Sequence, residues 1–199
     1  MNLQLEAMAL AMPEVAGHPN RLPFRGVLTL VGVASQRAPK GAQGHRVMLT
    51  RGATDAALSS LLGMALDYAP SLDSHDVRRK IGIITEANIV PLHPGGQPNP
   101  TGQLAVSGYL FAHDFPDVVD EIRAQAAAAG STLGMSYEIT QIEVPNQGAA
   151  IWTATAFTFT GAAVLRRDKA AYPQTWIALD SQPVAGGGGG PGKAGGHGQ

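Results

Sequence analysis

The stretch "TLGMSYEITQIEV" (residues 132–144) decides the fold class of this chain. From Met135 onward it places apolar and β-branched residues between polar ones, as a strand with one buried face does. The stretch "AIWTATAFTFTGAAVL" (150–165) has the same strand-like character, and the turn "PNQG" (145–148) separates the two. The sequence therefore predicts two strands joined as a hairpin, within a fold that is mainly β.

The rest of the chain adds four strands, two helices and one short helical segment to this pair. Apolar, β-branched runs predict strands, whereas leucines and alanines at helical spacing predict helices. The order β-β-α-β-β-α-β-β predicts an α+β fold, a small antiparallel sheet or β-barrel with flanking helices. We expect strands at 24–35, 45–50, 80–90 and 104–112, the last two as a hairpin, and helices at 54–69 (capped by Thr54 or Asp55), 115–129 (ended by Gly130) and, briefly, 167–172.

Composition along the chain predicts one domain between two tails. The 199 residues are enough for one domain with a core. Residues 1–20 are expected to be a flexible lead-in, and residues 21–180 carry the β domain. Residues 181–199 are rich in glycine and cannot bury a core, so we expect a disordered tail there.

Composition also excludes several classes of function. The net charge of -1 gives no electrostatic basis for binding nucleic acid or an anionic membrane. The chain has no cysteine, which rules out disulfides and thiolate chemistry. No apolar run approaches the ~18 residues of a membrane span, and the N-terminus lacks the pattern of a signal peptide. These features predict a soluble protein made and used in a cytoplasm.

The common cofactor and nucleophile motifs are absent from the sequence. The six histidines form no HxH or HExxH pattern, so no metal site is predicted. No phosphate-binding glycine motif opens a helix after a strand, so no nucleotide is predicted either. Ser136 follows Gly134 but precedes Glu138, which does not match the GxSxG elbow of α/β-hydrolases. We expect no cofactor.

Ser136 and His75 are the residues best placed for chemistry. Ser136 lies near the start of its strand, after a glycine-containing corner. A hydroxyl is a poor nucleophile unless a base, usually an imidazole, lies within hydrogen-bond reach. His75 lies in the polar loop "SLDSHDV" (71–77), and loops of this kind often present functional groups. The sequence thus offers Ser136 as a nucleophile and His75 as its general base, although each also fits an ordinary structural role.

The order of these segments resembles the prohead serine proteases of tailed bacteriophages, which are distantly related in fold to the herpesvirus assemblins. The resemblance is carried by "SHDVRRKIGIITEANIV" (74–90) and "GQLAVSGYLFAHDFPDVVDEIRAQAAAAGSTLGMSYEI" (102–139), and it covers about residues 22–180. The matching features are His75-Asp76, Gly82 with Thr85-Glu86, Leu104-Val106-Gly108, the 115–129 helix and Gly134-Met135-Ser136. The resemblance implies an assemblin-type β-barrel in which Ser136 is the nucleophile and His75 the base.

The resemblance places a third catalytic member on the strand after the serine strand, as a histidine in assemblins and usually an acid in phage relatives. A hairpin centred on "PNQG" puts the partner of Ser136 near residue 157. That region offers Thr158 and Thr160 but no acid or histidine, so the sequence departs from the family pattern. A threonine hydroxyl could orient an imidazole but would stabilise imidazolium less than a carboxylate does.

Three acids could take the place of the missing one, and the sequence does not rank them. Glu138 shares a strand face with Ser136, whereas Glu143 faces the other way unless a bulge intervenes. Asp76 fits a turn residue better than a catalytic one.

The resemblance also raises an oxyanion role and a dimer. Assemblins use an arginine pair beyond the third member, and Arg166 and Arg167 lie at a comparable place, where a solvated strand end explains them equally well. Assemblins dimerise through a helix, and "AQAAAA" (124–129) is small and apolar enough either to pack against a second copy or to cover the sheet.

Together these features predict a serine endopeptidase of phage capsid maturation. Its expected substrates are the scaffolding protein, the major capsid protein or both, with the enzyme itself as a further candidate. Its expected location is the host cytoplasm, inside the assembling procapsid. No nucleic acid or membrane partner is expected. The alternatives are a non-catalytic scaffold or decoration protein on the same barrel and a small ligand-binding β-barrel.

Overall fold

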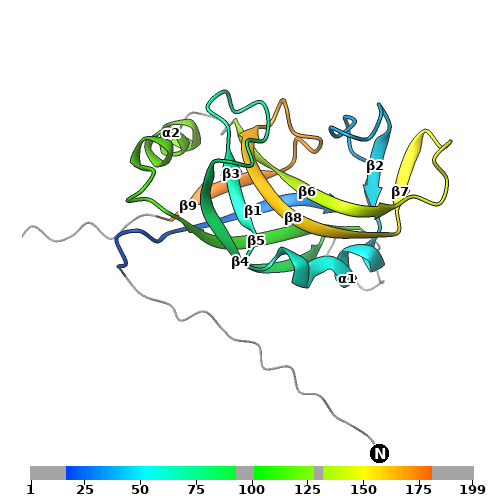
Figure 1. Cartoon of the computed structure of the whole chain (residues 1–199), viewed down its shortest axis with the longest axis horizontal. Helices are drawn as coiled ribbons and strands as arrows, with labels where there is room; N and C mark the ends of the chain where they lie inside the picture. The colour runs from blue at the N-terminus through cyan, green and yellow to red at the C-terminus, as the bar shows by residue number, and fades with distance from the viewer. Residues whose placement is uncertain (1–16, 93–100, 128–131, 181–199) are drawn as a thin grey trace, which may run out of the picture.

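The computed structural model describes residues 17–92, 101–127 and 132–180 of the chain, in which two sheets form a mainly β fold (Figure 1). Seven strands make one sheet in the order β6-β8-β3-β4-β5-β1-β9, and β2 and β7 make a second, parallel sheet. The elements are β1 Leu22–Val31, β2 Arg46–Leu49, α1 Arg51–Leu61, β3 Ala65–Tyr68, β4 Lys80–Pro91, β5 Gly102–Leu110, α2 Pro116–Ala127, β6 Leu133–Glu143, β7 Ile151–Ala154, β8 Ala156–Arg166 and β9 Trp176–Leu179.

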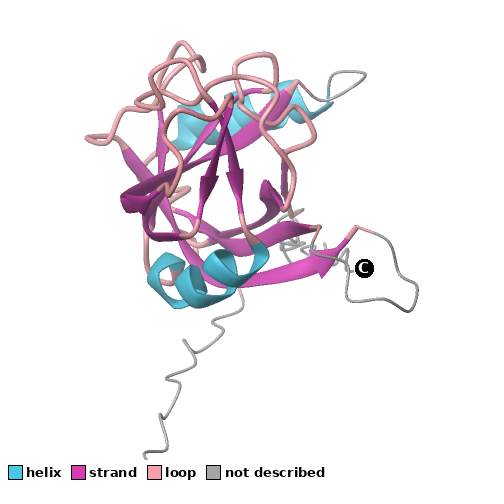
Figure 2. Cartoon of the chain, turned by 90° about the vertical axis from the view of Figure 1, so that its right-hand side faces the viewer, coloured by secondary structure: helices cyan, strands magenta, loops and turns pink. Residues whose placement is uncertain are grey.

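The seven-stranded sheet curls around an apolar interior, as a half-barrel with a helix near each end (Figure 2). Side chains from several strands fill the interior. Among them are Phe24 of β1, Leu66 of β3, Ile84 of β4 and Phe159 of β8, which are all buried. The curl brings β6 over β1, where a Cβ on Gly26 would lie 2.7 Å from Met135 Sδ. Glycine at residue 26 therefore lets the two strands approach across the interior.

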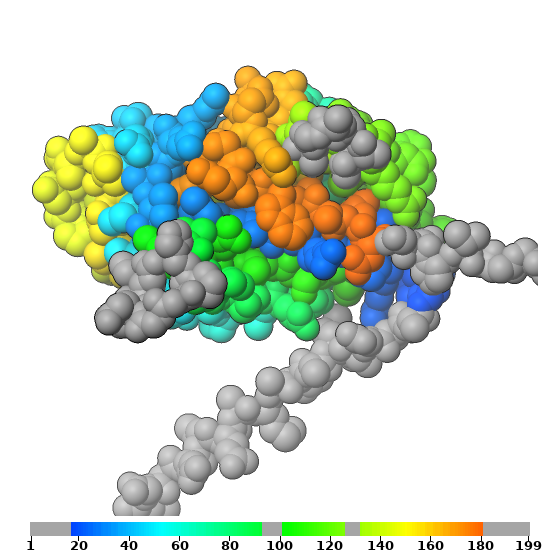
Figure 3. Space-filling model, turned by 180° about the vertical axis from the view of Figure 1, so that it is seen from behind, coloured from blue at the N-terminus to red at the C-terminus, as the bar shows by residue number. Residues whose placement is uncertain are grey.

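Thr175 ties the two edges of this curled sheet together. It directly precedes the edge strand β9, and its hydroxyl accepts a hydrogen bond from the Met135 N–H of the other edge strand, β6, at 3.0 Å. The same hydroxyl donates to Tyr172 O at 2.9 Å. Figure 3 shows the segment that follows β8, in orange, lying across the blue residues of β1. These contacts close the half-barrel at one end.

The helix expected at 54–69 is shorter than predicted, and its second half is a strand. Thr50 caps α1 by accepting from Ala53 N at 3.3 Å, so the predicted caps Thr54 and Asp55 are wrong. Gly63 has a φ of +79°, which ends helical winding because glycine tolerates this region. The chain then enters β3, which pairs parallel with β8 and antiparallel with β4.

The predicted register of the last two long strands is also wrong. Ser136 pairs with Ala163, six residues beyond the residue 157 that a tight hairpin would require. The reason is that the connection is long: β7 leaves the large sheet and pairs in parallel with β2. In Figure 3 the yellow β7 segment accordingly lies beside the blue residues that include β2.

Of the remaining predictions, some are confirmed, one is wrong and others lie outside the described residues. The hairpin of β4 and β5 is confirmed, as is Pro116 at the start of α2. Residues 167–172 form turns and not a helix, and β9 was not predicted. Most of the lead-in (1–16), the end of the second helix at Gly130 and the tail (181–199) lie outside the described part. Neither α1 nor α2 has the length and apolarity to cross a membrane.

We predict that Gly108→Ala destabilises the fold and that Gly52→Ala does not. Gly108 lies between β1 and β4, and a Cβ there would lie 2.0 Å from the backbone oxygen of Ile83. Overpacking of this kind costs about 1–3 kcal/mol. Gly52 is exposed in α1 and a Cβ there meets nothing within 4 Å. Urea unfolding followed by circular dichroism measures both variants, and equal stabilities would contradict the expected crowding.

Candidate active site

The candidate site is built on the outer face of the curled sheet. Along β3 and β8, Leu66 and Ala162 belong to the interior cluster, so the residues that follow them, Asp67 and Ala163, face the other side. Ser136 on β6 pairs with Ala163, which itself pairs with Asp67. Ser136 and Asp67 therefore lie in one row of the sheet, on either side of a small alanine.

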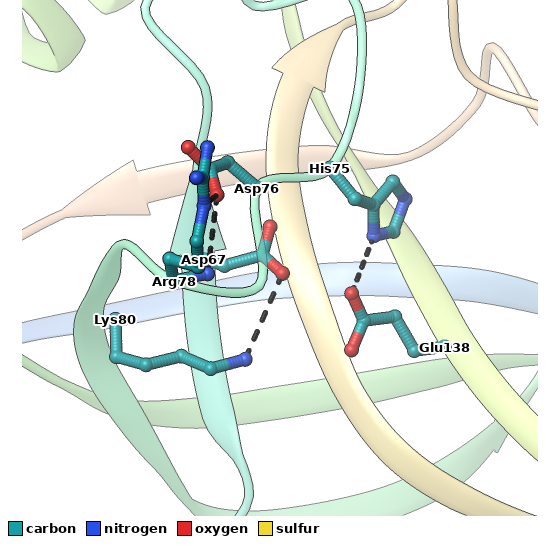
Figure 4. A network of polar contacts seen from close by, with 6 residues as sticks. All are labelled: Asp67, His75, Asp76, Arg78, Lys80 and Glu138. Atoms are coloured by element: carbon teal, nitrogen blue, oxygen red, sulfur yellow. Dashed lines mark hydrogen bonds and ion pairs between the residues drawn. The ribbon is translucent and has the colours of Figure 1, made fainter.

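The loop 69–79, between β3 and β4, brings His75 onto this face. His75 Nδ1 lies 2.9 Å from Glu138 Oε1, and Figure 4 shows the imidazole and the carboxylate facing each other. Glu138 follows Ser136 by two residues, so both side chains are on the same face of β6. Gly161 pairs with Glu138, and a Cβ there would lie 2.5 Å from Glu138 Oε2. The glycine thus leaves room for the carboxylate.

The contact between His75 and Glu138 sets which imidazole nitrogen carries hydrogen. A carboxylate only accepts, so Nδ1 donates to Glu138 and Nε2 presents a lone pair. Figure 4 shows this second nitrogen turned away from Glu138. Among the described residues, neither Nε2 of His75 nor the hydroxyl of Ser136 has a hydrogen-bond partner. The site therefore contains an oriented base and an unengaged hydroxyl, although no hydrogen bond joins the two.

His75, Ser136 and Glu138 line one cavity of about 480 Å³. It lies between β6, an edge strand of the large sheet, and the smaller β2–β7 sheet. Three of its lining side chains are cationic, those of Arg37, Lys40 and Lys169, and none of them makes an ion pair within the described part of the chain. The remaining lining residues are Ala38, Pro39, Gly41, Ala42, Val47, Tyr137, Ile139, Ile142, Trp152 and Ala171.

Asp67 is a buried acid beside this pair. Its side chain has no exposed surface, and neither carboxylate oxygen has a hydrogen bond of good geometry, although the Glu138 carboxylate is near enough to share a proton with Asp67. Lys80 Nζ lies 3.8 Å from Asp67 Oδ2, beyond hydrogen-bond distance. Burial, and then the nearby Glu138 carboxylate, raise the pKa of Asp67 to about 7, against the lowering effect of Lys80. Asp67 is therefore easily protonated near neutral pH.

Glu138 is held in its ionised form by its neighbours. Burial alone would raise its pKa, but the groups around it, Asp67, His75 and Lys80, outweigh burial and bring the pKa below its ordinary value. An ionised Glu138 is the form that accepts the Nδ1 hydrogen and stabilises a positive imidazole. Asp67, His75 and Glu138 each offer one ligand atom within 4.8 Å of the others, so this cluster is also able to hold a metal ion.

The structure places the predicted third members apart from His75, with one exception. Thr158 pairs with Thr140, and its hydroxyl donates to Gln141 Oε1 at 3.0 Å. Thr160 is exposed at a bulge in β8, with Glu138 paired to the residue after it. Of the predicted residues, only Glu138 contacts the imidazole.

The two remaining acids also lie elsewhere. Asp76 Oδ1 accepts from the backbone and side chain of Arg78, each at 3.1 Å, as a turn residue would. Glu143 is exposed at the end of β6, where it pairs with Ala156.

Arg166 and Arg167 do not line the cavity. Arg166 Nε lies 3.2 Å from Asp168 Oδ1. Arg167 Nε donates to Leu133 O at 3.0 Å and to Thr175 O at 2.9 Å, so it supports the closure of the half-barrel. The cations that do line the cavity are Arg37, Lys40 and Lys169, which sequence reasoning missed.

Asp67 was missed because it lay inside the expected helix at 54–69. Gly63 is the signal that could have revealed it, since a glycine after Leu61 and Leu62 is a common helix end. Ending the helix there leaves "MALDYA" (64–69), a short apolar run with one acid, which is the pattern of a buried strand carrying a functional group.

Comparisons with known proteins identify no relative. No protein-family model, curated protein or solved structure matches this chain.

We predict that Arg167→Ala destabilises the protein by about 1–3 kcal/mol, because two carbonyl oxygens lose their donor. Arg166→Ala is the matched control and should change stability by less than about 0.5 kcal/mol, since its ion pair with Asp168 is on the surface. Urea unfolding measures both. Equal losses would contradict the structural role assigned to Arg167.

Proposed function

We propose that this protein is a serine endopeptidase of phage capsid maturation, with Ser136 as nucleophile and His75 as general base. The observation that carries the proposal is the 2.9 Å contact between His75 Nδ1 and Glu138 Oε1. It supplies the acid that the sequence lacked near residue 158. Because Glu138 lies on the serine strand itself, two residues after Ser136, the arrangement departs from the assemblin pattern.

In this mechanism the imidazole spans the distance between the acid and the nucleophile. Residues two apart on a strand have Cα atoms roughly 7 Å apart, so an imidazole bonded to Glu138 can reach toward Ser136 with its other nitrogen. Nε2 takes the hydroxyl proton as Ser136 attacks a peptide carbonyl, and it then protonates the leaving amine. Glu138 holds the ring and stabilises its positive charge. In the proposal, substrate binding brings the Ser136 hydroxyl within hydrogen-bond distance of His75 Nε2.

The cavity supports a peptide as the substrate. The free edge of β6 offers backbone groups with which an extended chain can pair, and the cavity runs along that edge. Ile139, Ile142 and Trp152 supply apolar contacts for its side chains. Met135 N–H is already bonded to Thr175 and so does not serve the oxyanion. In the proposal, the positive charge for the oxyanion comes from the cavity's cations.

The biological setting in this proposal rests on the resemblance to prohead proteases. The substrates are the scaffolding protein and the major capsid protein, and the enzyme cleaves itself as well. Cleavage takes place inside the procapsid, in the host cytoplasm. The stretch expected to make a dimer contact (124–129) lies only partly within the described residues. The alternative of a non-catalytic capsid protein loses its main support, which was the missing acid, because Glu138 contacts His75.

We predict that a fluorophosphonate probe labels the wild-type protein at Ser136 and does not label Ser136→Ala. The reason is that only an activated hydroxyl attacks the phosphorus atom. Ser107→Ala is the matched control, because Ser107 lies on β5 and its hydroxyl donates to Glu86 and not to a histidine. Intact-protein mass spectrometry and peptide mapping provide the measurement.

Two outcomes would count against the proposal. Unlabelled wild-type protein would favour the non-catalytic capsid protein or the ligand-binding barrel. Labelling at another serine would move the nucleophile away from Ser136. Co-expression with the coat protein then tests the biological role, since Ser136→Ala should leave the coat protein uncut while the fold is retained.

We predict that Glu138→Gln slows labelling by about 10²–10⁴-fold, because an amide neither stabilises imidazolium nor holds the required tautomer. Thr158→Val is the matched control and should label at the wild-type rate, since its hydroxyl bonds to Gln141. The second-order rate of labelling is the measurement. If Thr158→Val labelled slowly and Glu138→Gln labelled at the wild-type rate, Thr158 and not Glu138 would be the third catalytic member.

A further inference from the structure

Three elements meet at the cluster of Asp67, His75 and Glu138: strand β3, the loop 69–79 and strand β6. One ligand atom from each residue lies within 4.8 Å of the others. Two ligand atoms of one tetrahedral zinc ion lie roughly 3.3–3.6 Å apart, since each bond is about 2.0–2.2 Å long. The 2.9 Å between His75 Nδ1 and Glu138 Oε1 is somewhat shorter than that spacing, and no pair in the cluster exceeds 4.8 Å. Small side-chain movements would therefore bring all three ligand atoms to one ion.

Asp67 in its ionised form is only weakly compensated. Its side chain is 0 % exposed, neither oxygen has a hydrogen bond of good geometry, and its ion-pair partner Lys80 lies 3.8 Å away. A buried carboxylate without partners is costly unless a cation or a proton compensates it. Figure 4 shows this carboxylate in the space between Lys80 and the His75–Glu138 pair. Lys80 is 39 % exposed and 3.8 Å away, so its ammonium can turn to solvent and leave the space to an ion.

We propose that Asp67, His75 and Glu138 form a binding site for a first-row divalent cation such as Zn²⁺, and that the bound ion switches off the Ser136 centre. The second half of this proposal rests on the proposed function, whereas the first half does not. One imidazole nitrogen and two carboxylate oxygens suit Zn²⁺, Mn²⁺ or Co²⁺, and the remaining position is left for water. Mg²⁺ and Ca²⁺ prefer ligand sets made entirely of oxygen.

The ion and the His75–Glu138 hydrogen bond exclude each other. An ion on Nδ1 takes the position of the hydrogen that Glu138 otherwise accepts. Glu138 then binds the ion and no longer holds the imidazole, and the single ring hydrogen moves to Nε2, which can then no longer accept the Ser136 proton. Nucleophile activation at Ser136 and ion binding therefore compete for the same two side chains.

Titration calorimetry with ZnCl₂ on the chelator-treated full chain tests the binding site. We expect one Zn²⁺ per chain with a raised Tm, no heat with Mg²⁺ or Ca²⁺, and at least about tenfold weaker binding in Asp67→Asn and Glu138→Gln. Asp73→Asn, an exposed acid of the same loop, is the matched control and should bind as the wild type does. Circular dichroism confirms that each variant is folded. If no Zn²⁺ binds, or if Asp67→Asn binds as tightly as Asp73→Asn, the site is overturned.

Fluorophosphonate labelling at Ser136, with and without ZnCl₂, tests the switch. At a Zn²⁺ concentration that calorimetry shows to saturate the wild type but not Asp67→Asn, we expect labelling of the wild type to slow at least tenfold and excess chelator to restore the rate. Asp67→Asn should keep most of its own metal-free rate at that concentration. Unchanged labelling of the Zn²⁺-bound wild type overturns the switch. Ser136→Ala should still bind Zn²⁺, so a chain that never labels but binds the ion contradicts the peptidase proposal and leaves the metal site standing.

Discussion

The parallel pairing of β3 with β8 is the constraint on which the site depends. It inserts a four-residue strand between β8 and β4 and turns Asp67 to the outer face, in the same row as Ser136. The loop that must then return from β3 to β4 passes over that face and delivers His75. Without this short strand, the base would have no fixed position relative to the serine strand, and the outer face of β8 would be an ordinary solvated surface.

The site concentrates negative charge where burial makes it costly. Asp67 and Glu138 are near neighbours on one face, with Lys80 and His75 as the nearest groups able to compensate them. Two neighbouring carboxylates repel each other when both are ionised. The pKa of Asp67 therefore rises to about 7, while that of Glu138 falls. In the two proposals, the same excess of negative charge stabilises a positive imidazole during proton transfer and attracts a divalent cation. One electrostatic feature thus underlies both proposals.

The open edge of β6 relates the fold to the peptide substrate that we propose. An exposed strand edge is normally protected, because its backbone groups can pair with another chain. Here one end of the edge is closed by Thr175 and Arg167, and the remainder borders the cavity next to Ser136. Arg167 therefore contributes to the architecture of the edge, whereas Lys169, two residues later, faces the cavity. Neighbouring cations in one segment have separate roles that only their contacts distinguish.

The sequence by itself determined the mainly β class, the β4–β5 hairpin, the helix that starts at Pro116 and the same-face relation of Ser136 and Glu138, because these follow from local periodicity and turn chemistry. It missed β3, because leucines at helical spacing concealed the helix end at Gly63. It misplaced the β6–β8 register, because a tight turn was assumed where β7 departs to pair with β2. Only the tertiary structure decided that Glu138, and not Thr158, meets His75, and that Asp67 joins them. Those contacts link residues up to 71 positions apart. They depend on the register of the strands and on the path of the loop, and no local sequence pattern encodes either.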